Sequence, residues 1–147
     1  MPTLRDTLLD PANRSKVIDD CCQMVADEVS SKRGLTGLAV KAAFKTVRAF
    51  RPNIIEAVIE ALLEDFVTNL EPLYEAFQES ESTDLKRYCV QRSGDIADAL
   101  LAITDGRAER SKLKTLVKAY KKLRPQGRKH VEEAVPRIAS LLNAHGL

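Results

Sequence analysis

The sequence predicts an all-α protein, built as a single bundle of about six to eight helices in antiparallel hairpins. Apolar residues recur at helical spacing along nearly the whole chain, and the alternating β-branched and aromatic runs typical of strands are missing. The chain has 147 residues, of which 44% are hydrophobic and 30% charged, and this composition is typical of a globular protein of one domain. We therefore expect one helical domain over residues 1–147.

The first 34 residues predict a short capped segment followed by a long helix. Thr3 can cap the first segment through its side-chain oxygen. Pro11, directly behind Asp10, suits the first position of the long helix, which should stop near Gly34. The core-facing side of that helix, taken at i, i+4, i+7 and i+11, would comprise Ile18, Cys22, Val25 and Val29.

A second long helix is expected from Thr36 to Phe50. It should end there because Arg51 precedes a proline, and the residue before proline avoids helical angles. Pro52 in turn suits the first turn of a third helix. The wide apolar face of this third helix would consist of Ile55, Val58, Ile59, Leu62 and Phe66.

The third helix should end or kink just before Pro72, because proline removes a backbone donor and clashes with the preceding turn. Residues 72–79 would then continue it or form a short fourth helix. The polar stretch "SESTD", residues 80–84, predicts a loop before a helix that runs through Val90. Three residues of this loop can cap that helix: Ser82, Thr83 and Asp84.

Three more helices are expected in the last third of the chain. Ser93 can cap the first of them, which should reach Gly106. A basic amphipathic helix follows and should stop before Pro125. Pro136 should restart or kink the last helix, which closes the chain.

The two halves of the chain, roughly residues 14–72 and 86–145, are similar enough to suggest an internal duplication. Each holds a basic amphipathic helix, an Arg-Pro corner and an apolar helix, and the two corner prolines, Pro52 and Pro125, lie 73 residues apart. Any two helix-proline-helix corners look alike at this level. The sequence therefore leaves both duplication and chance similarity open.

Signatures of catalysis, cofactor binding and metal binding are missing, and we expect a non-enzymatic protein without a cofactor. Around His130 the sequence "HVEEA" lacks the second histidine that a zinc-protease helix carries four residues on, and no phosphate loop or nucleophile elbow occurs. The chain has three cysteines, Cys21, Cys22 and Cys89. Because their number is odd and their spacing does not match a metal site, we expect reduced, largely buried thiols. An enzyme would need a pocket that gathers Cys89 or Cys21 with His130.

Charge is distributed unevenly along the chain, although the formal net charge is only +2. Residues 56–84 carry nine acids and no Lys or Arg, whereas residues 107–130 carry ten Lys or Arg and one acid. Cations at helical spacing form two candidate basic faces, Lys41, Lys45 and Arg48 on one helix and Lys114, Lys118, Lys121 and Lys122 on another. A candidate acidic face consists of Glu56, Glu60 and Glu64.

These faces have two interpretations. They can be solvated outer surfaces or rims that pair across neighbouring helices, where each exposed pair gives under about 1 kcal/mol. They can also be functional, and we then expect a helical interaction or scaffold protein that uses them for protein–protein contact or self-association. The alternative is binding of an anionic ligand, a lipid surface or nucleic acid through the basic faces. Base stacking needs exposed aromatic residues, and the few Phe and Tyr occupy core-type positions.

The sequence also predicts a cytoplasmic location. The first residues, "MPTLRDTLLDP", lack the basic and then apolar order of a signal peptide. No stretch of about 18 apolar residues occurs, so an integral membrane protein is not expected.

Four segments carry a resemblance to a known family: "GLTGLAVKAAFKTVRAFRP", "LLEDFVTNLEPLYEAF", "DALLAITDGRAERS" and "KAYKKLRP". Through them the chain resembles a family of uncharacterised bacterial all-helical proteins, a domain of unknown function, over most of its length. The resemblance implies a cytoplasmic bacterial helical protein. It assigns no activity and no functional residue.

Overall fold

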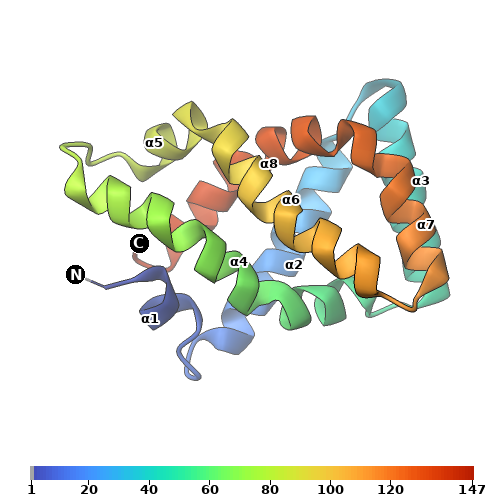
Figure 1. Cartoon of the computed structure of the whole chain (residues 1–147), viewed down its shortest axis with the longest axis horizontal. Helices are drawn as coiled ribbons and strands as arrows, with labels where there is room; N and C mark the ends of the chain where they lie inside the picture. The colour runs from blue at the N-terminus through green and yellow to red at the C-terminus, as the bar shows by residue number, and fades with distance from the viewer. Residues whose placement is uncertain (1) are drawn as a thin grey trace.

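The computed structural model of the chain describes residues 2–147, and within this range it contains α-helices, one 3₁₀ turn and no strand. The all-α bundle predicted from the sequence is therefore confirmed (Figure 1). The helices are α1 (Leu4–Leu8), α2 (Arg14–Ser31), α3 (Gly34–Phe50), α4 (Ile54–Glu79), α5 (Leu85–Gln91), α6 (Ser93–Arg110), α7 (Lys114–Leu123) and α8 (Gly127–Ala144), with the 3₁₀ turn η1 (Arg124–Gln126) between the last two.

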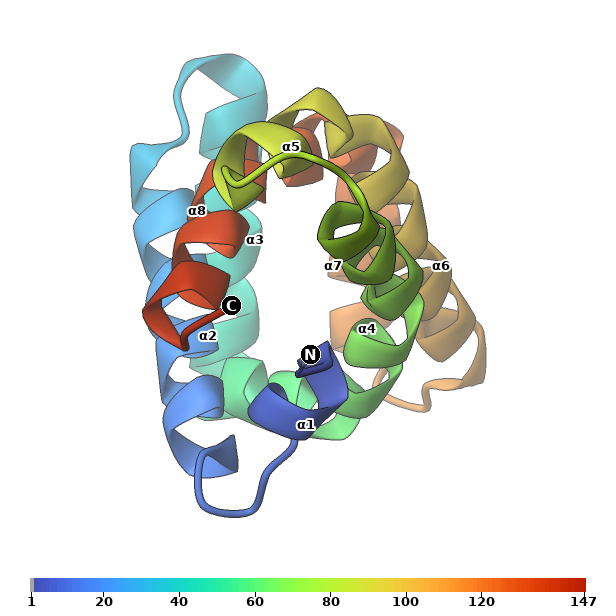
Figure 2. The same cartoon turned by 90° about the vertical axis from the view of Figure 1, so that its left-hand side faces the viewer.

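The long helices form two sides of the molecule. Helices α2 and α8 pack together on one side, and α4 and α6 pack together on the other, as the end-on view shows (Figure 2). Helices α3 and α7 pack against each other at the end of the molecule opposite the chain termini (Figure 1). This arrangement places the two helices that carry the predicted basic faces side by side.

The hydrophobic core lies between the two sides and excludes the α3–α7 end. Its buried residues come from α1, α2, α4, α5, α6 and α8, and they include Leu4, Val17, Val67, Ile96 and Val135. Helix α3 has only Gly37 and Val47 buried, and α7 has no buried residue. Helices α3 and α7 are thus held mainly by each other and by their connections.

The packing of the first four helices has a counterpart in the last four. Helix α1 packs on α4 as α5 packs on α8, and α2 packs on α4 as α6 packs on α8. Between the halves, α2 packs on α8 and α4 on α6, while α3 pairs with its counterpart α7. A two-fold relation between residues 14–72 and 86–145 would produce the contacts of α2, α3 and α4 and of their counterparts α6, α7 and α8, whereas α1 lies before the first copy. The duplication itself stays a prediction.

The structure confirms several predicted helix ends that depend on local chemistry. The Thr3 hydroxyl accepts from the amide of Asp6 at 2.9 Å, and the Asp6 carboxylate accepts from the Thr3 amide in return, which is a capping box. Asp84 caps α5 by accepting from the amide of Arg87 at 3.1 Å. Helix α3 ends at Phe50, as the Arg-Pro corner predicts.

The sequence left either a break or a kink open at Pro72 and Pro136, and the break is wrong, because α4 and α8 run through these prolines. Residues 72–79 continue α4, which is one of the two outcomes expected for them. An interior proline costs a helix about 3 kcal/mol. Core residues lie on both sides of each proline: Val67 and Tyr74 in α4, and Val135 and Ala139 in α8. Their burial, at roughly 25 cal/mol per Å² of apolar surface, offsets the cost of keeping the helix continuous.

Three further boundaries differ from expectation. Helix α2 begins at Arg14 rather than at Pro11, because the Asp10 backbone carbonyl and carboxylate hold residues 10–14 in a turn. Helix α6 continues past Gly106 to Arg110, since an interior glycine costs only about 1 kcal/mol. Ser93 lies inside α6 and makes no capping hydrogen bond. No helix in residues 2–147 is long and apolar enough to cross a membrane.

Candidate functional site

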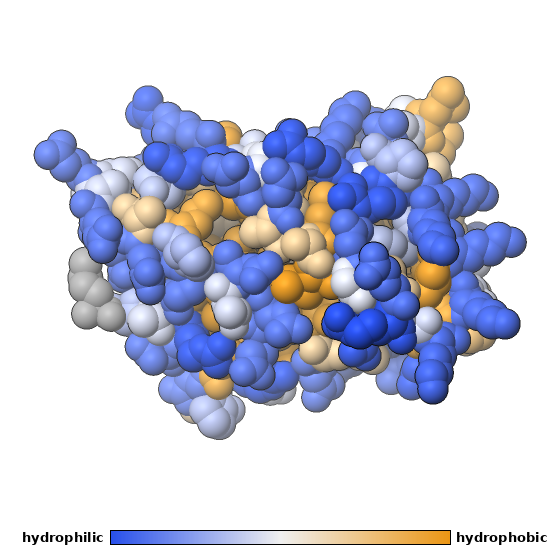
Figure 3. Space-filling model, in the orientation of Figure 1, coloured by the Kyte–Doolittle hydropathy of each residue, from blue (hydrophilic) through white to orange (hydrophobic). Residues whose placement is uncertain are grey.

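The predicted basic faces lie on the packed pair α3 and α7. Helix α3 carries three of the seven cations and α7 carries four, and neither helix contains an Asp or Glu. Hydrophilic side chains project from this end of the molecule in the space-filling view (Figure 3). The fold therefore concentrates positive charge that the sequence separates by more than sixty residues.

Within residues 2–147, none of the seven cations takes part in an ion pair. The acidic row is exposed on α4, where Glu64 pairs with Arg5 of α1 at 3.3 Å. Glu64 thus meets α1, and none of the three acidic residues pairs with a cation of α3 or α7 in the described chain. The charges of α3 and α7 are left available for a partner.

A groove between α2 and α3 brings the α3 cations together with apolar residues. It has a volume of about 720 Å³ and is lined by Lys41, Lys45 and Arg48 together with Ala26, Val29, Ser30, Phe44, Ala49 and Pro52. The Arg48 guanidinium lies 5.5 Å from the centre of the Phe44 ring, within cation–π range. This combination of hydrocarbon surface and unpaired cations is suited to an amphipathic anionic partner.

Helix α3 also carries three of the four large hydrophobic side chains that are exposed in residues 2–147. Leu35 is 86% exposed, Leu38 62% and Phe50 54%. The space-filling view shows a hydrophobic patch at the corner where α3 begins (Figure 3). Leu35 and Leu38 lie one turn apart at the start of α3, whereas Phe50 lies at its other end. Single exposed leucines are ordinary, but two together on a helix that carries unpaired cations favour an interaction surface.

The α7 cations line a separate hollow. Lys114, Lys118 and Lys121 surround about 400 Å³ of open space with Ser111 and Val117. No residue is shared between this hollow and the α2–α3 groove. Six of the seven candidate cations therefore form two neighbouring basic sites rather than one, and Lys122 lines neither hollow.

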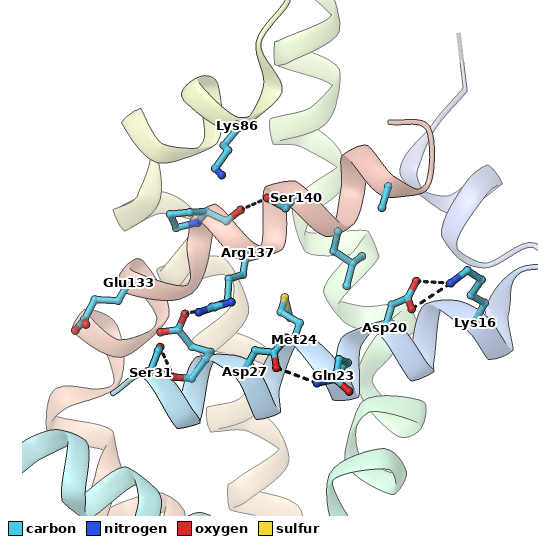
Figure 4. Close-up of a pocket in the computed structure, with 14 residues that line it drawn as sticks. Lys16, Asp20, Gln23, Met24, Asp27, Ser31, Lys86, Glu133, Arg137 and Ser140 are labelled. Carbon is cyan, nitrogen blue, oxygen red and sulfur yellow. Dashed lines mark hydrogen bonds and ion pairs between the residues drawn. The ribbon is translucent and has the colours of Figure 1, made fainter. Parts of the chain in front are cut away.

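The groove between α2 and α8, about 940 Å³ in volume, is lined by charged side chains, several of which pair with one another, while Lys86 of α5 has no ion pair there within residues 2–147 (Figure 4). Arg137 of α8 points to Glu28 of α2, with Nε 3.1 Å from Oε1. On α2, Lys16 Nζ lies 3.2 Å from the Asp20 carboxylate. The Arg137–Glu28 contact joins the two helices, whereas the Lys16–Asp20 contact lies within α2. Both occupy charged groups that a ligand would otherwise meet.

Sequence reasoning missed a buried lysine at the end of α2. The side chain of Lys32 is only 4% exposed, and its Nζ lies 2.9 Å from Glu28, 3.1 Å from the backbone oxygen of His130 and 3.7 Å from Glu133. In the sequence this lysine lies in the polar segment "SSKRG", which predicts solvent exposure. Helix α8 and the start of α3 cover it, through His130 and Glu133 and through the close approach of Gly37.

His130 is nearly buried beside this lysine. Neither ring nitrogen makes a hydrogen bond with a residue of the described chain. Burial lowers the pKa of His130 below its ordinary value, and the nearby Lys32 ammonium lowers it further. The imidazole is therefore held neutral at physiological pH.

The thiol–imidazole pair that an enzyme would need is not assembled. Lys32 contacts the backbone of His130, and Cys21 lies eleven residues before Lys32. Eleven residues span about 16 Å along a helix axis, so Cys21 is far from the contact with His130. Cys21 lines an apolar cavity of about 160 Å³ that His130 does not line, and Cys89 is buried in the core. Burial raises the pKa of both thiols to about 11, which keeps them protonated.

Residues 2–147 contain no group of three or more His, Cys, Asp and Glu placed to hold a metal ion. Comparison with curated proteins and with solved structures gave no match. A family model described as a family of unknown function matches residues 4–146, nearly the whole chain. The resemblance stated from the sequence is thereby confirmed, while the bacterial origin stays a prediction. The chain belongs to the family of unknown function DUF6918.

Proposed function

We propose that this protein is a non-enzymatic interaction module that binds an acidic segment of a partner protein in the groove between α2 and α3. The observation that carries the proposal is the row formed by Lys41, Lys45 and Arg48, which lines an apolar groove without a single ion pair in the described chain.

The geometry of the row favours a helical partner. Side chains at i, i+4 and i+7 lie on one helix face in successive turns, so carboxylates at the same spacing on a partner helix can face them in register. Apolar residues of such a helix would cover Val29, Phe44 and Ala49. Helix-in-groove recognition of this kind combines apolar burial with charge complementarity.

Nucleic acid and a lipid surface fit this groove less well than an acidic helix does. Phosphates would engage the cations, but bases need exposed aromatic platforms. The aromatic ring in the groove, Phe44, is half-buried with Arg48 over it, and the exposed Phe50 does not line the groove. A membrane-surface helix buries a continuous row of bulky side chains. The bulky exposed side chains of α3 lie only near its two ends, at Leu35, Leu38 and Phe50. The stretch between them presents the exposed residues Ala39, Ala42 and Ala49. A partner helix can approach such small side chains closely.

We place this activity in the cytoplasm. The three cysteines are free, and free thiols persist in a reducing compartment.

The test uses two labelled peptides, an amphipathic helix with Glu at i, i+4 and i+7 and its counterpart with Lys at these positions. Fluorescence anisotropy should show binding of the Glu peptide alone, weakening as salt rises. The double variant Lys41→Glu/Lys45→Glu should reduce this affinity by at least about tenfold. The matched control, Lys118→Glu/Lys121→Glu, changes net charge equally on α7 and should have a smaller effect.

Equal losses in both double variants would show attraction by net charge only and would contradict a groove site. A single-stranded RNA and vesicles of anionic lipid serve as competing probes, and tighter binding of either would overturn the choice of a protein partner. Light scattering at low salt tests self-association through the acidic α4 face, Glu56, Glu60 and Glu64. A salt-sensitive dimer that the groove variant abolishes would make a second copy the partner.

A further inference from the structure

Helix α7 turns its apolar face toward a pocket instead of a packed core. The helix is strongly amphipathic, yet none of its ten residues is buried. Leu116, Val117 and Tyr120 line a pocket of about 220 Å³ between α4, α6 and α7. Side chains beside empty space lack the dispersion contacts that a filled core supplies, so an apolar occupant would gain them.

The opposite wall of the pocket is also hydrocarbon. Helix α4 contributes Ile54, Ala57, Val58, Ala61 and Leu62, and α6 contributes Ala108. An apolar cavity of about 150 Å³ stays dry and accepts benzene. A pocket of about 220 Å³ therefore has room for a somewhat larger hydrocarbon group.

Two arginines at the same pocket indicate the charge of the occupant. Arg51 lies at the corner between α3 and α4 and Arg107 lies on α6; both are exposed and line the pocket. Neither side chain makes an ion pair or hydrogen bond with another residue in 2–147.

Arg124, at the edge of the same pocket, differs from these two arginines because its charge is paired within the protein. Arg124 is held by Asp105 through two hydrogen bonds of 2.8 and 3.1 Å, and the hydroxyl of Tyr120 is shared between Asp105 and Thr104. The polar groups at this edge of the pocket are therefore satisfied within the protein. The positive charges of Arg51 and Arg107 are not.

We propose that this pocket binds a small amphiphilic anion. Its hydrocarbon tail lies between α4 and α7, and its carboxylate or phosphate head meets Arg51 and Arg107, whose forked donors suit both groups. The site is distinct from the α2–α3 groove, shares no lining residue with it and does not depend on the proposed function.

The experiment compares octanoate, octyl phosphate and octanol by calorimetric titration of the full chain. Both anions should bind at least about tenfold more tightly than octanol, because only they engage the arginines. Arg107→Gln and Arg51→Gln should each remove most of this difference. Arg110→Gln, on the same helix but outside the pocket lining, is the matched control and should leave the affinities unchanged.

Methyl NMR locates the site independently of any variant. The signals of Val58, Leu116 and Val117 should shift on titration, whereas those of the exposed Leu35 and Leu38 should not. Ala57→Leu, which fills the pocket, should abolish the shifts, and circular dichroism checks that it remains folded. If it does not fold, the arginine variants and the wild-type methyl shifts decide.

The head-group assignment is overturned if octanol binds as tightly as the anions or if both arginine variants bind like wild type. No binding of any probe at millimolar concentration overturns the site. Shifts confined to Leu35 and Leu38 would place the ligand elsewhere and overturn it as well. Comparison of octanoate with octyl phosphate identifies the preferred head.

Discussion

The ammonium of Lys32 lies 2.9 Å from a carboxylate oxygen of Glu28, one helical turn earlier, with the lysine side chain 4% exposed and the glutamate 13%. Arg137 of α8 approaches the other oxygen of the same carboxylate at 3.1 Å. A single carboxylate thus joins two cations from two helices. The C-terminal end of α2 is tied to α8 by charge as well as by apolar contact.

This arrangement predicts unequal effects of removing the two partners. Glu28→Gln leaves Lys32 as a buried cation with only the more distant Glu133, and it should lower the free energy of unfolding by about 3 kcal/mol. Lys32→Met removes the charge and keeps a long side chain, so it should cost only about 1 to 2 kcal/mol, mainly for the lost bond to the His130 oxygen. Urea unfolding measures both.

The exposed pair formed by Lys16 and Asp20 provides the control for this comparison. Lys16→Met should change stability by less than about 1 kcal/mol, because the lysine is 74% exposed. A loss in Lys32→Met as large as that in Glu28→Gln would show that the ammonium itself, rather than its pairing, stabilises the fold.

The neutral His130 predicts a pH dependence of stability. Its folded pKa is lowered from 6.5 by burial and by Lys32, with Lys129 acting in the same direction and Glu133 and Glu28 opposing. The unfolded chain therefore takes up the proton first as the pH falls. The stabilising contribution is complete above about pH 6.5 and is lost as the pH drops from there through the folded pKa.

The substitution His130→Leu should flatten the stability profile between pH 5 and 7, measured as the urea midpoint at each pH. Asp105→Asn is the control, because the hydrogen bond from Arg124 holds the pKa of the Asp105 carboxyl below its ordinary value of 3.8, outside this pH range. An unchanged slope in His130→Leu would rule out His130 as the titrating group.

Alanine substitutions at two glycines should change the stability of the protein in opposite directions. A Cβ at Gly37 would lie 2.8 Å from the backbone carbon of Lys32, where α3 starts against the end of α2. Gly37→Ala should therefore destabilise by about 1 to 3 kcal/mol. At Gly106, inside α6, the nearest atom would be 3.6 Å away on the flexible Arg110, so Gly106→Ala should stabilise by up to about 1 kcal/mol. Thermal unfolding of both variants tests the contrast, and effects of the same sign would contradict it.

The cysteines should react slowly in the folded protein. With a pKa of about 11, Cys21 and Cys89 hold roughly a hundredfold less thiolate at pH 8 than an ordinary thiol does. The pKa of Cys22 is raised too, by burial and then by Glu56 and Asp19. Iodoacetamide labelling followed by mass spectrometry should show slow modification in buffer and rapid modification in urea. Fast labelling of any one cysteine in buffer would reveal an activated thiol and reopen the enzymatic alternative.

The all-helical fold class, the loop at residues 80–84 and several helix ends could be predicted from the sequence, because they depend on residues only a few positions away. Thr3 and Asp84 cap helices through amides three positions on, and the Arg-Pro corner stops α3 at Phe50. Pro72 shows where local rules fail: the core contacts of Val67 and Tyr74 keep α4 continuous. Local chemistry decided what can be helical, and packing decided where the helices continue.

The sequence by itself determined the spacing of Lys41, Lys45 and Arg48 along one helix face, and that these cations outnumber nearby acids. Only the tertiary structure decided that α2 completes a groove beside them, that α7 packs on α3, and that α8 buries Lys32. The physical reason is the distance along the chain over which each interaction acts. Helical periodicity and capping act within about four residues, whereas the partners of a helix face are chosen by burial among segments distant in the chain.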